Sequence, residues 1–83
     1  MTPLQVHILE LLAADALYCR ALVKRSGRLK SGTVYKMLSR MEDKGYVVSA
    51  MTRTGIPKRL YKLTELGYRT LKGYRAMEAA ING

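Results

Sequence analysis

Residues 31–45 are the segment that most constrains how this chain can fold. Its apolar residues recur at helical spacing and predict one buried face, made of Val34, Met37, Leu38 and Met41. Ser31 or Thr33 can serve as the helix N-cap, because a short side-chain oxygen accepts a backbone N–H there, and Gly45 can end the helix. The segment is therefore predicted to be a helix that packs one side against the rest of the chain.

The opposite side of this predicted helix is polar and mostly basic. It carries Lys36, Ser39 and Arg40, together with the acidic Asp43. A helix with such a front fits the major groove of DNA, which is wide enough to admit one. Taken alone, the pattern favours an ordinary solvated surface helix, and the rest of the chain reverses that preference.

The charge distribution points to a polyanionic partner. The 83-residue chain has a net charge of +9, with 15 basic and 6 acidic residues. Twelve of the basic residues but only two of the acidic ones fall within residues 20–62. Such a patch attracts nucleic acid. An anionic membrane surface is the competing partner, but it would need large apolar anchors on a basic helix, and this segment offers few.

Composition excludes several other classes of protein. One cysteine, Cys19, and one histidine, His7, leave neither an internal disulfide nor a zinc cluster, and no cofactor is expected. Membrane-length apolar runs and a secretory signal are missing, so we expect a cytoplasmic protein with no membrane partner. The sequence has no Ser/His/Asp grouping, phosphate-binding glycine loop or paired carboxylates, which argues against an enzyme and leaves no catalytic residue to name.

The residues before the central helix predict two more helices. Thr2, Pro3 and Gln5 make a capping box with proline at the first helical position, and the helix should reach residue 13 or 14. Residues 15–18 are expected to be a connection, followed by a short helix through Cys19 to about residue 25, which Gly27 ends. A helix, a short turn and a second helix form the helix-turn-helix order.

The residues after Gly45 predict a β-hairpin. Residues 46–52 are rich in β-formers, residues 53–58 carry turn residues with two positive charges, and residues 59–63 are extended again. The buried face of the strands stays open, because Val47 and Val48 are adjacent. The predicted fold is mainly α with a small β-hairpin: a winged helix-turn-helix domain over residues 1–63 and a C-terminal helix over residues 64–83.

The C-terminal helix should begin at the cap Thr64-Glu65. Gly67 and Gly73 weaken it, and close approach to another element would compensate. Its apolar stripe has little left in this chain to pack against, so we expect a second copy to cover it and form a homodimer. The expected dimer interface comprises Leu66, Thr70, Tyr74, Met77 and Ile81.

Three stretches resemble the PadR-like transcriptional regulators. The first is Gly32-Thr33-Val34-Tyr35 followed by Leu38, Arg40-Met41-Glu42 and Gly45-Tyr46-Val47, similar to the family's G-T-L-Y-P and L-x-R-L-E-x-x-G. The second runs from Arg59 to Gly67, similar to R-x-Y-x-L-T-x-x-G, and the third is Leu17-Tyr18. The resemblance covers residues 4–72. It departs where Lys36 replaces a proline and where Cys19-Arg20-Ala21 replaces Gly-Tyr-Glu. Larger family members continue into a C-terminal domain that serves dimerisation and often binds an effector. The resemblance, which ends before such a domain, therefore does not indicate whether this chain has a small-molecule effector.

The resemblance implies a winged-helix dimer that binds double-stranded operator DNA and acts as a repressor. Hydroxyl and cationic groups around the central helix and in the loop then become the candidate DNA contacts: Arg28, Lys30, Ser31, Thr33, Tyr35, Lys36, Ser39, Arg40, Arg53, Thr54, Lys58 and Arg59. The main alternative is a winged-helix protein–protein module, such as a phage or plasmid accessory protein. RNA binding ranks third, because the chain has neither Trp nor Phe for base stacking.

Overall fold

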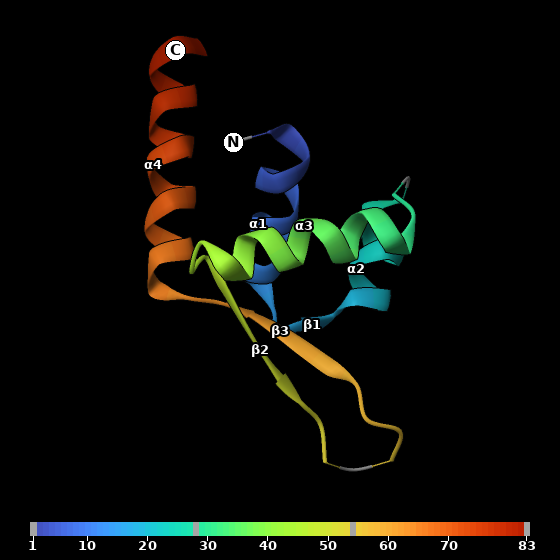
Figure 1. Ribbon diagram of the computed structural model, residues 1–83. Helices are drawn as coiled ribbons and strands as arrows, with labels where there is room; N and C mark the ends of the chain where they lie inside the picture. The colour runs from blue at the N-terminus through green and yellow to red at the C-terminus, as the bar shows by residue number, and fades with distance from the viewer. Residues whose placement is uncertain (1, 28, 54, 83) are drawn as a thin grey trace.

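The computed structural model describes residues 2–27, 29–53 and 55–82, with side chains through residue 80. In chain order the elements are α1 (Pro3–Ala14), β1 (Leu17–Tyr18), α2 (Cys19–Ser26), α3 (Ser31–Asp43), β2 (Val47–Met51), β3 (Arg59–Leu63) and α4 (Glu65–Asn82). Helices α1 to α3 gather on one side, the hairpin of β2 and β3 projects away from them, and α4 stands beside α1 (Figure 1). The architecture is a winged helix-turn-helix with one further helix, which confirms the predicted fold class.

One apolar core joins the helices to the sheet. The side chains of Ile8 and Leu9 from α1, Leu22 from α2, and Val34 and Leu38 from α3 are fully buried. The apolar face predicted for residues 31–45 is therefore confirmed. Burial of a leucine or isoleucine side chain stabilises the fold by about 1.5–3 kcal/mol, so this contact fixes which face of α3 is left to solvent.

Helix ends follow the predicted caps with one exception. The Thr2 hydroxyl accepts the backbone N–H of Gln5 at 3.2 Å, and the Gln5 side chain accepts that of Thr2 at 3.1 Å, which confirms the capping box. Gly45 lies just beyond α3 with φ of 83°, as expected of the residue that ends a helix. The prediction of Ser31 or Thr33 as N-cap was wrong. Lys30 holds that position, because its backbone is already extended and Ser31 is the first helical residue.

The sheet has three antiparallel strands in the order β1-β3-β2. Residues 17 and 18, expected to be part of a connection, instead pair with β3 through Leu17 opposite Tyr61 and Tyr18 opposite Leu60. That prediction was wrong because two residues are too short to show a strand period. The register of β2 on β3 places Val47 opposite Leu63, so that Val47 is buried and Val48 is exposed.

Thr64 connects the end of α3, the sheet and α4. Its hydroxyl donates to the carbonyl oxygen of Gly45 at 2.6 Å and accepts the backbone N–H of Gly67 at 3.0 Å, while its own N–H donates to the carbonyl of Tyr46 at 3.0 Å. The predicted cap of the last helix is confirmed. A Cβ on Gly67 would lie 2.2 Å from the Tyr46 oxygen, so close approach holds there, whereas Gly73 meets nothing within 4 Å among the described residues.

Candidate nucleic-acid interface

The first turn of α3 presents polar groups to solvent. Lys30, Ser31 and Thr33 are all exposed, and no side chain among the described residues caps the helix N-terminus. The free N–H groups of such a terminus carry partial positive charge and suit a phosphate oxygen. Three of the predicted contact residues thus share one helix end, while Arg28, another predicted contact, lies outside the described residues.

The front of α3 is polar and apolar-poor. Lys36 lies about 200° around the helix from the buried Val34, which points it away from the core. Ser39 and Lys36 are exposed on this front, and among the described residues of α3 Tyr35 is the one large apolar side chain in the open, with 57% of its surface exposed. This surface suits base edges and phosphates better than a protein partner.

The wing is the hairpin of β2 and β3, and hydrogen bonds join the two ends of its loop. The Thr52 N–H donates to the carbonyl of Lys58 at 2.8 Å, and the Lys58 N–H donates to the Thr52 hydroxyl at 3.1 Å. Gly55 supplies a positive φ of 68° in the turn between them. Arg53 and Ile56 are exposed, Ile56 to 79%. Two hydrogen bonds therefore hold the ends of the wing loop together, and Thr54, another predicted contact, lies outside the described residues.

A relay of polar side chains ties α3 to the wing. Ser49 on β2 donates its hydroxyl proton to Glu42 Oε2 at 2.6 Å and accepts from Arg59 Nη1 at 2.9 Å. Arg59, predicted as a DNA contact, is thereby held against β2 while it stays exposed. The relay sets where the Arg59 charge lies relative to α3.

A hollow of about 290 Å³ lies between the start of α2, α3 and the base of the wing. The structure brings three of the candidate contacts, Tyr35, Lys58 and Arg59, to this hollow. Arg20 from α2 joins them there, and sequence reasoning missed it. The signal that could have found it is the four-residue spacing of Arg20 and Lys24, which puts two cations on one side of a short helix.

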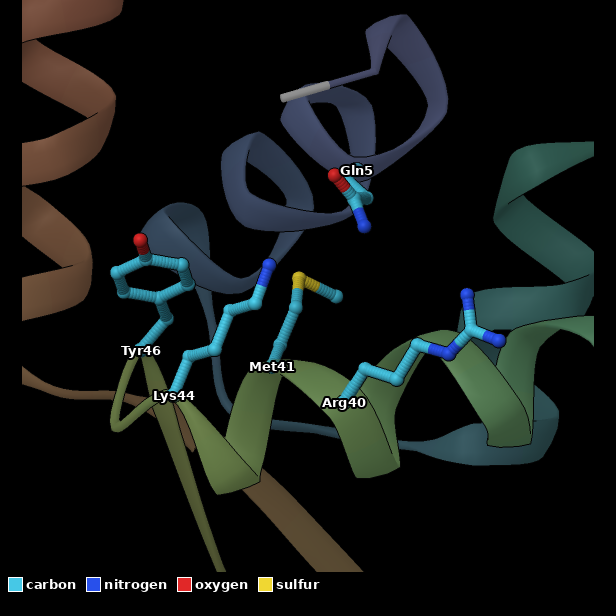
Figure 2. A pocket seen from close by; sticks show the side chains of 5 residues that line it. All are labelled: Gln5, Arg40, Met41, Lys44 and Tyr46. Carbon is cyan, nitrogen blue, oxygen red and sulfur yellow. The ribbon is translucent and has the colours of Figure 1, made fainter.

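Arg40 lies apart from the wing. It lines a smaller hollow of about 80 Å³ with Gln5 of α1, Lys44 and Tyr46. Figure 2 shows the Arg40 and Lys44 side chains on the side of α3 that faces α1, whereas β2 and β3 leave on the other side. Arg40 therefore does not share the hollow of Tyr35, Lys58 and Arg59, and it extends the basic surface along the other flank of α3.

Two titratable side chains that line the hollow, Tyr61 and Cys19, have raised pKa values. Burial raises the pKa of the Tyr61 phenol, and the Arg59 charge opposes that rise in part. Burial also raises the pKa of the Cys19 thiol. Both groups are therefore neutral at physiological pH, so the charge around the hollow is set by its arginines and lysines.

No group of three or more His, Cys, Asp or Glu side chains among the described residues could hold a metal ion. Within the same ranges, no helix has both the length and the apolar character needed to cross a membrane.

Solved structures with this fold include regulators of transcription. A PadR-like transcription factor from Bacteroides fragilis is 25% identical over 95% of this chain and 82% of its own, with a TM-score of 0.85. A PadR family transcription regulator from Clostridium difficile R20291 is 26% identical over 98% and 96%, with a TM-score of 0.79. The S. aureus MepR–DNA complex shares the fold at 21% identity over 99% and 68%, with a TM-score of 0.85.

The family model spans the helix-turn-helix, the wing and the first half of α4. No curated protein matches the sequence. The model of the transcriptional regulator PadR-like family matches residues 8–73, which is most of the chain and includes both α3 and the wing. This family consists of transcription factors and not enzymes. The chain belongs to the PadR-like family of transcriptional regulators.

Proposed function

We propose that this regulator binds specific operator sequences in duplex DNA and represses transcription in the cytoplasm, with α3 in the major groove and the wing on the backbone or minor groove. One observation carries the proposal: Tyr35, on the exposed side of α3, lines one hollow together with Lys58 of the hydrogen-bonded wing loop and Arg59 of β3. A rigid cationic arrangement of this kind complements the phosphates on either side of a groove.

A protein–protein module is the weaker candidate. It would require an exposed apolar patch on α3, and Tyr35 is the one large apolar side chain exposed there among the described residues. RNA binding through stacked bases would require an aromatic platform on the sheet, where Tyr61 is buried. Both candidates are therefore less well supported than duplex DNA, whose phosphates suit the cations around α3 and the wing.

The first test is selection of bound sequences from a random duplex pool. A dimeric helix-turn-helix regulator should select a palindrome with half-sites about 10 base pairs apart, centre to centre. Affinity for the selected duplex should fall with salt with a log–log slope near −0.9 per neutralised phosphate. A flat salt response, or a selected pool without any shared sequence, would contradict the proposal.

A pair of variants separates base reading from backbone contact. Lys36→Ala removes a cation from the front of α3 and should cost about 1–3 kcal/mol on the operator, with less effect on a scrambled duplex. Arg40→Ala removes a cation from the flank that faces α1 and should weaken both duplexes equally. Anisotropy titrations on the two duplexes measure both effects. Equal losses on both duplexes for Lys36→Ala would reduce that residue to a phosphate contact.

We also propose that α4 mediates homodimerisation. Leu71 is 1% exposed and Tyr74 is half-buried against the core, so Tyr74 serves this chain's own packing. Leu66 and Met77 are 49% and 63% exposed, and Thr70 lies between them at helical spacing. Ile81, the last residue of the expected interface, has a side chain outside the described part. Leu66, Thr70 and Met77, which we call the α4 strip, form the apolar surface that a second copy would cover.

A further inference from the structure

Two adjoining hollows form one groove between α2 and the wing. Their volumes are about 290 and 380 Å³, and Tyr18, Arg20 and Lys58 line both. The first continues toward Tyr35 on α3, and the second continues along α2 to Lys24. We call this continuous surface the α2–wing groove. It begins at the recognition helix and leads away from it past the base of the wing.

The groove is lined with cations and lacks acids. Arg20, Lys24, Lys58 and Arg59 all line it, and no acidic side chain of the described residues does so. Arg20 and Lys24 are four residues apart on α2, so they project from the same side of that helix. Glu42 approaches Arg59 only through the Ser49 hydroxyl. Like charges gathered in this way repel one another, and an anion from outside the chain would relieve the repulsion.

Tyr18 positions one of these charges over the groove. The Lys58 ammonium lies 5.7 Å from the centre of the Tyr18 ring, within the range of a cation–π interaction. Lys58 is also the residue whose backbone closes the wing loop against Thr52. The hydrogen bonds to Thr52 therefore hold the Lys58 backbone, and the Tyr18 ring holds its ammonium group.

We infer that the α2–wing groove holds one strand of the DNA backbone, with Arg20 and Lys24 contacting phosphates beyond those reached by α3 and the wing. The inference rests on the proposed DNA binding and adds two contact residues on α2 to it. Charge complementarity supports the assignment, as does the continuity of the groove with the front of α3 through Tyr35. A DNA strand presents a charge every 3.4 Å or so along its axis, which suits a row of cations better than one compact anion does.

The test compares salt dependence in variants of the same helix. Arg20→Ala and Lys24→Ala should each make the log–log slope of affinity against salt shallower by about 0.9, because each removes one phosphate contact. The change should be equal on the selected operator and on a scrambled duplex. Arg25→Ala is the matched control, since Arg25 is exposed on α2 but does not line the groove, and its slope should equal that of the unmodified protein. Circular dichroism confirms that each variant is folded.

The outcomes separate this inference from the proposed function. If the unmodified protein binds DNA with a steep slope while Arg20→Ala and Lys24→Ala match Arg25→Ala, the groove is not a backbone site and DNA binding stands. A loss of affinity in Arg20→Ala or Lys24→Ala that is confined to the operator would also overturn the inference, because it would indicate that these residues contact bases. Tyr18→Phe should keep the affinity and Tyr18→Leu should lower it on both duplexes, since only the aromatic ring holds Lys58. Failure of the unmodified protein to bind any duplex would overturn both proposals.

Discussion

Two glycines of α4 that look alike in the sequence have opposite surroundings. A Cβ on Gly67 would lie 2.2 Å from the backbone oxygen of Tyr46 and 2.8 Å from Leu63, whereas one on Gly73 would meet nothing within 4 Å among the described residues. We predict that Gly67→Ala lowers the free energy of unfolding by about 1–3 kcal/mol, because the backbone must move to admit the methyl group. Urea unfolding followed by circular dichroism measures the loss.

Gly73→Ala is the matched control in the same helix. It should raise the free energy of unfolding by up to about 1 kcal/mol, because alanine has the higher helix propensity and the added methyl group has room. Similar effects of the two substitutions would contradict the close contact at Gly67.

At the scale of elements, the position of the wing depends on how α3, the hairpin and α4 are joined. The Thr64 hydroxyl connects all three, since it donates to Gly45 beyond α3 and accepts from Gly67 in α4. Thr64→Val keeps the shape and removes the hydroxyl, so it should lower the free energy of unfolding by about 1–2 kcal/mol through the lost cap. Thr64→Ser, which keeps the hydroxyl, should lose less in the same urea titration. Equal losses would show that the hydroxyl contributes little.

A second join sets the direction of the wing. The relay from Glu42 through Ser49 to Arg59 spans α3, β2 and β3, and the hydrogen bonds between Thr52 and Lys58 close the loop. The wing is thus braced by the relay along its strands and again at the two ends of its loop. A binding surface held in this way loses little conformational entropy when it meets DNA.

The whole molecule is elongated, with extents of 47 × 27 × 20 Å, and the C-terminal end of α4 extends past α1 (Figure 1). If the α4 strip is the dimer interface, Met77→Glu should produce monomers at concentrations where the unmodified protein is dimeric, because a charge would be buried without a partner. Analytical ultracentrifugation over a micromolar concentration range measures this shift. Lys72→Glu, at an exposed position on another side of α4, should leave the dimer intact. Monomers at all concentrations of the unmodified protein would exclude this interface.

Local patterns in the sequence determined most of the elements of this protein. The capping box at Thr2, the apolar spacing in residues 31–45 and the cap at Thr64 act over a few residues, so each could be predicted without the fold. The hairpin and the concentration of positive charge in residues 20–62 were predictable for the same reason.

Contacts between residues far apart in the chain decided the third strand, the buried face of the hairpin and the surroundings of the candidate contact residues. The pairing of Leu17 with Tyr61 joins segments far apart in the chain, and that pairing created a third strand where the sequence indicated a connection. Which of Val47 and Val48 is buried followed from the register with β3, and the α2–wing groove exists because the packing brings α2 and α3 beside the base of the wing. Arg40 likewise lies toward α1 because the core fixes the rotation of α3. Such features depend on how elements pack, and a single chain's local periodicity carries no information about that packing.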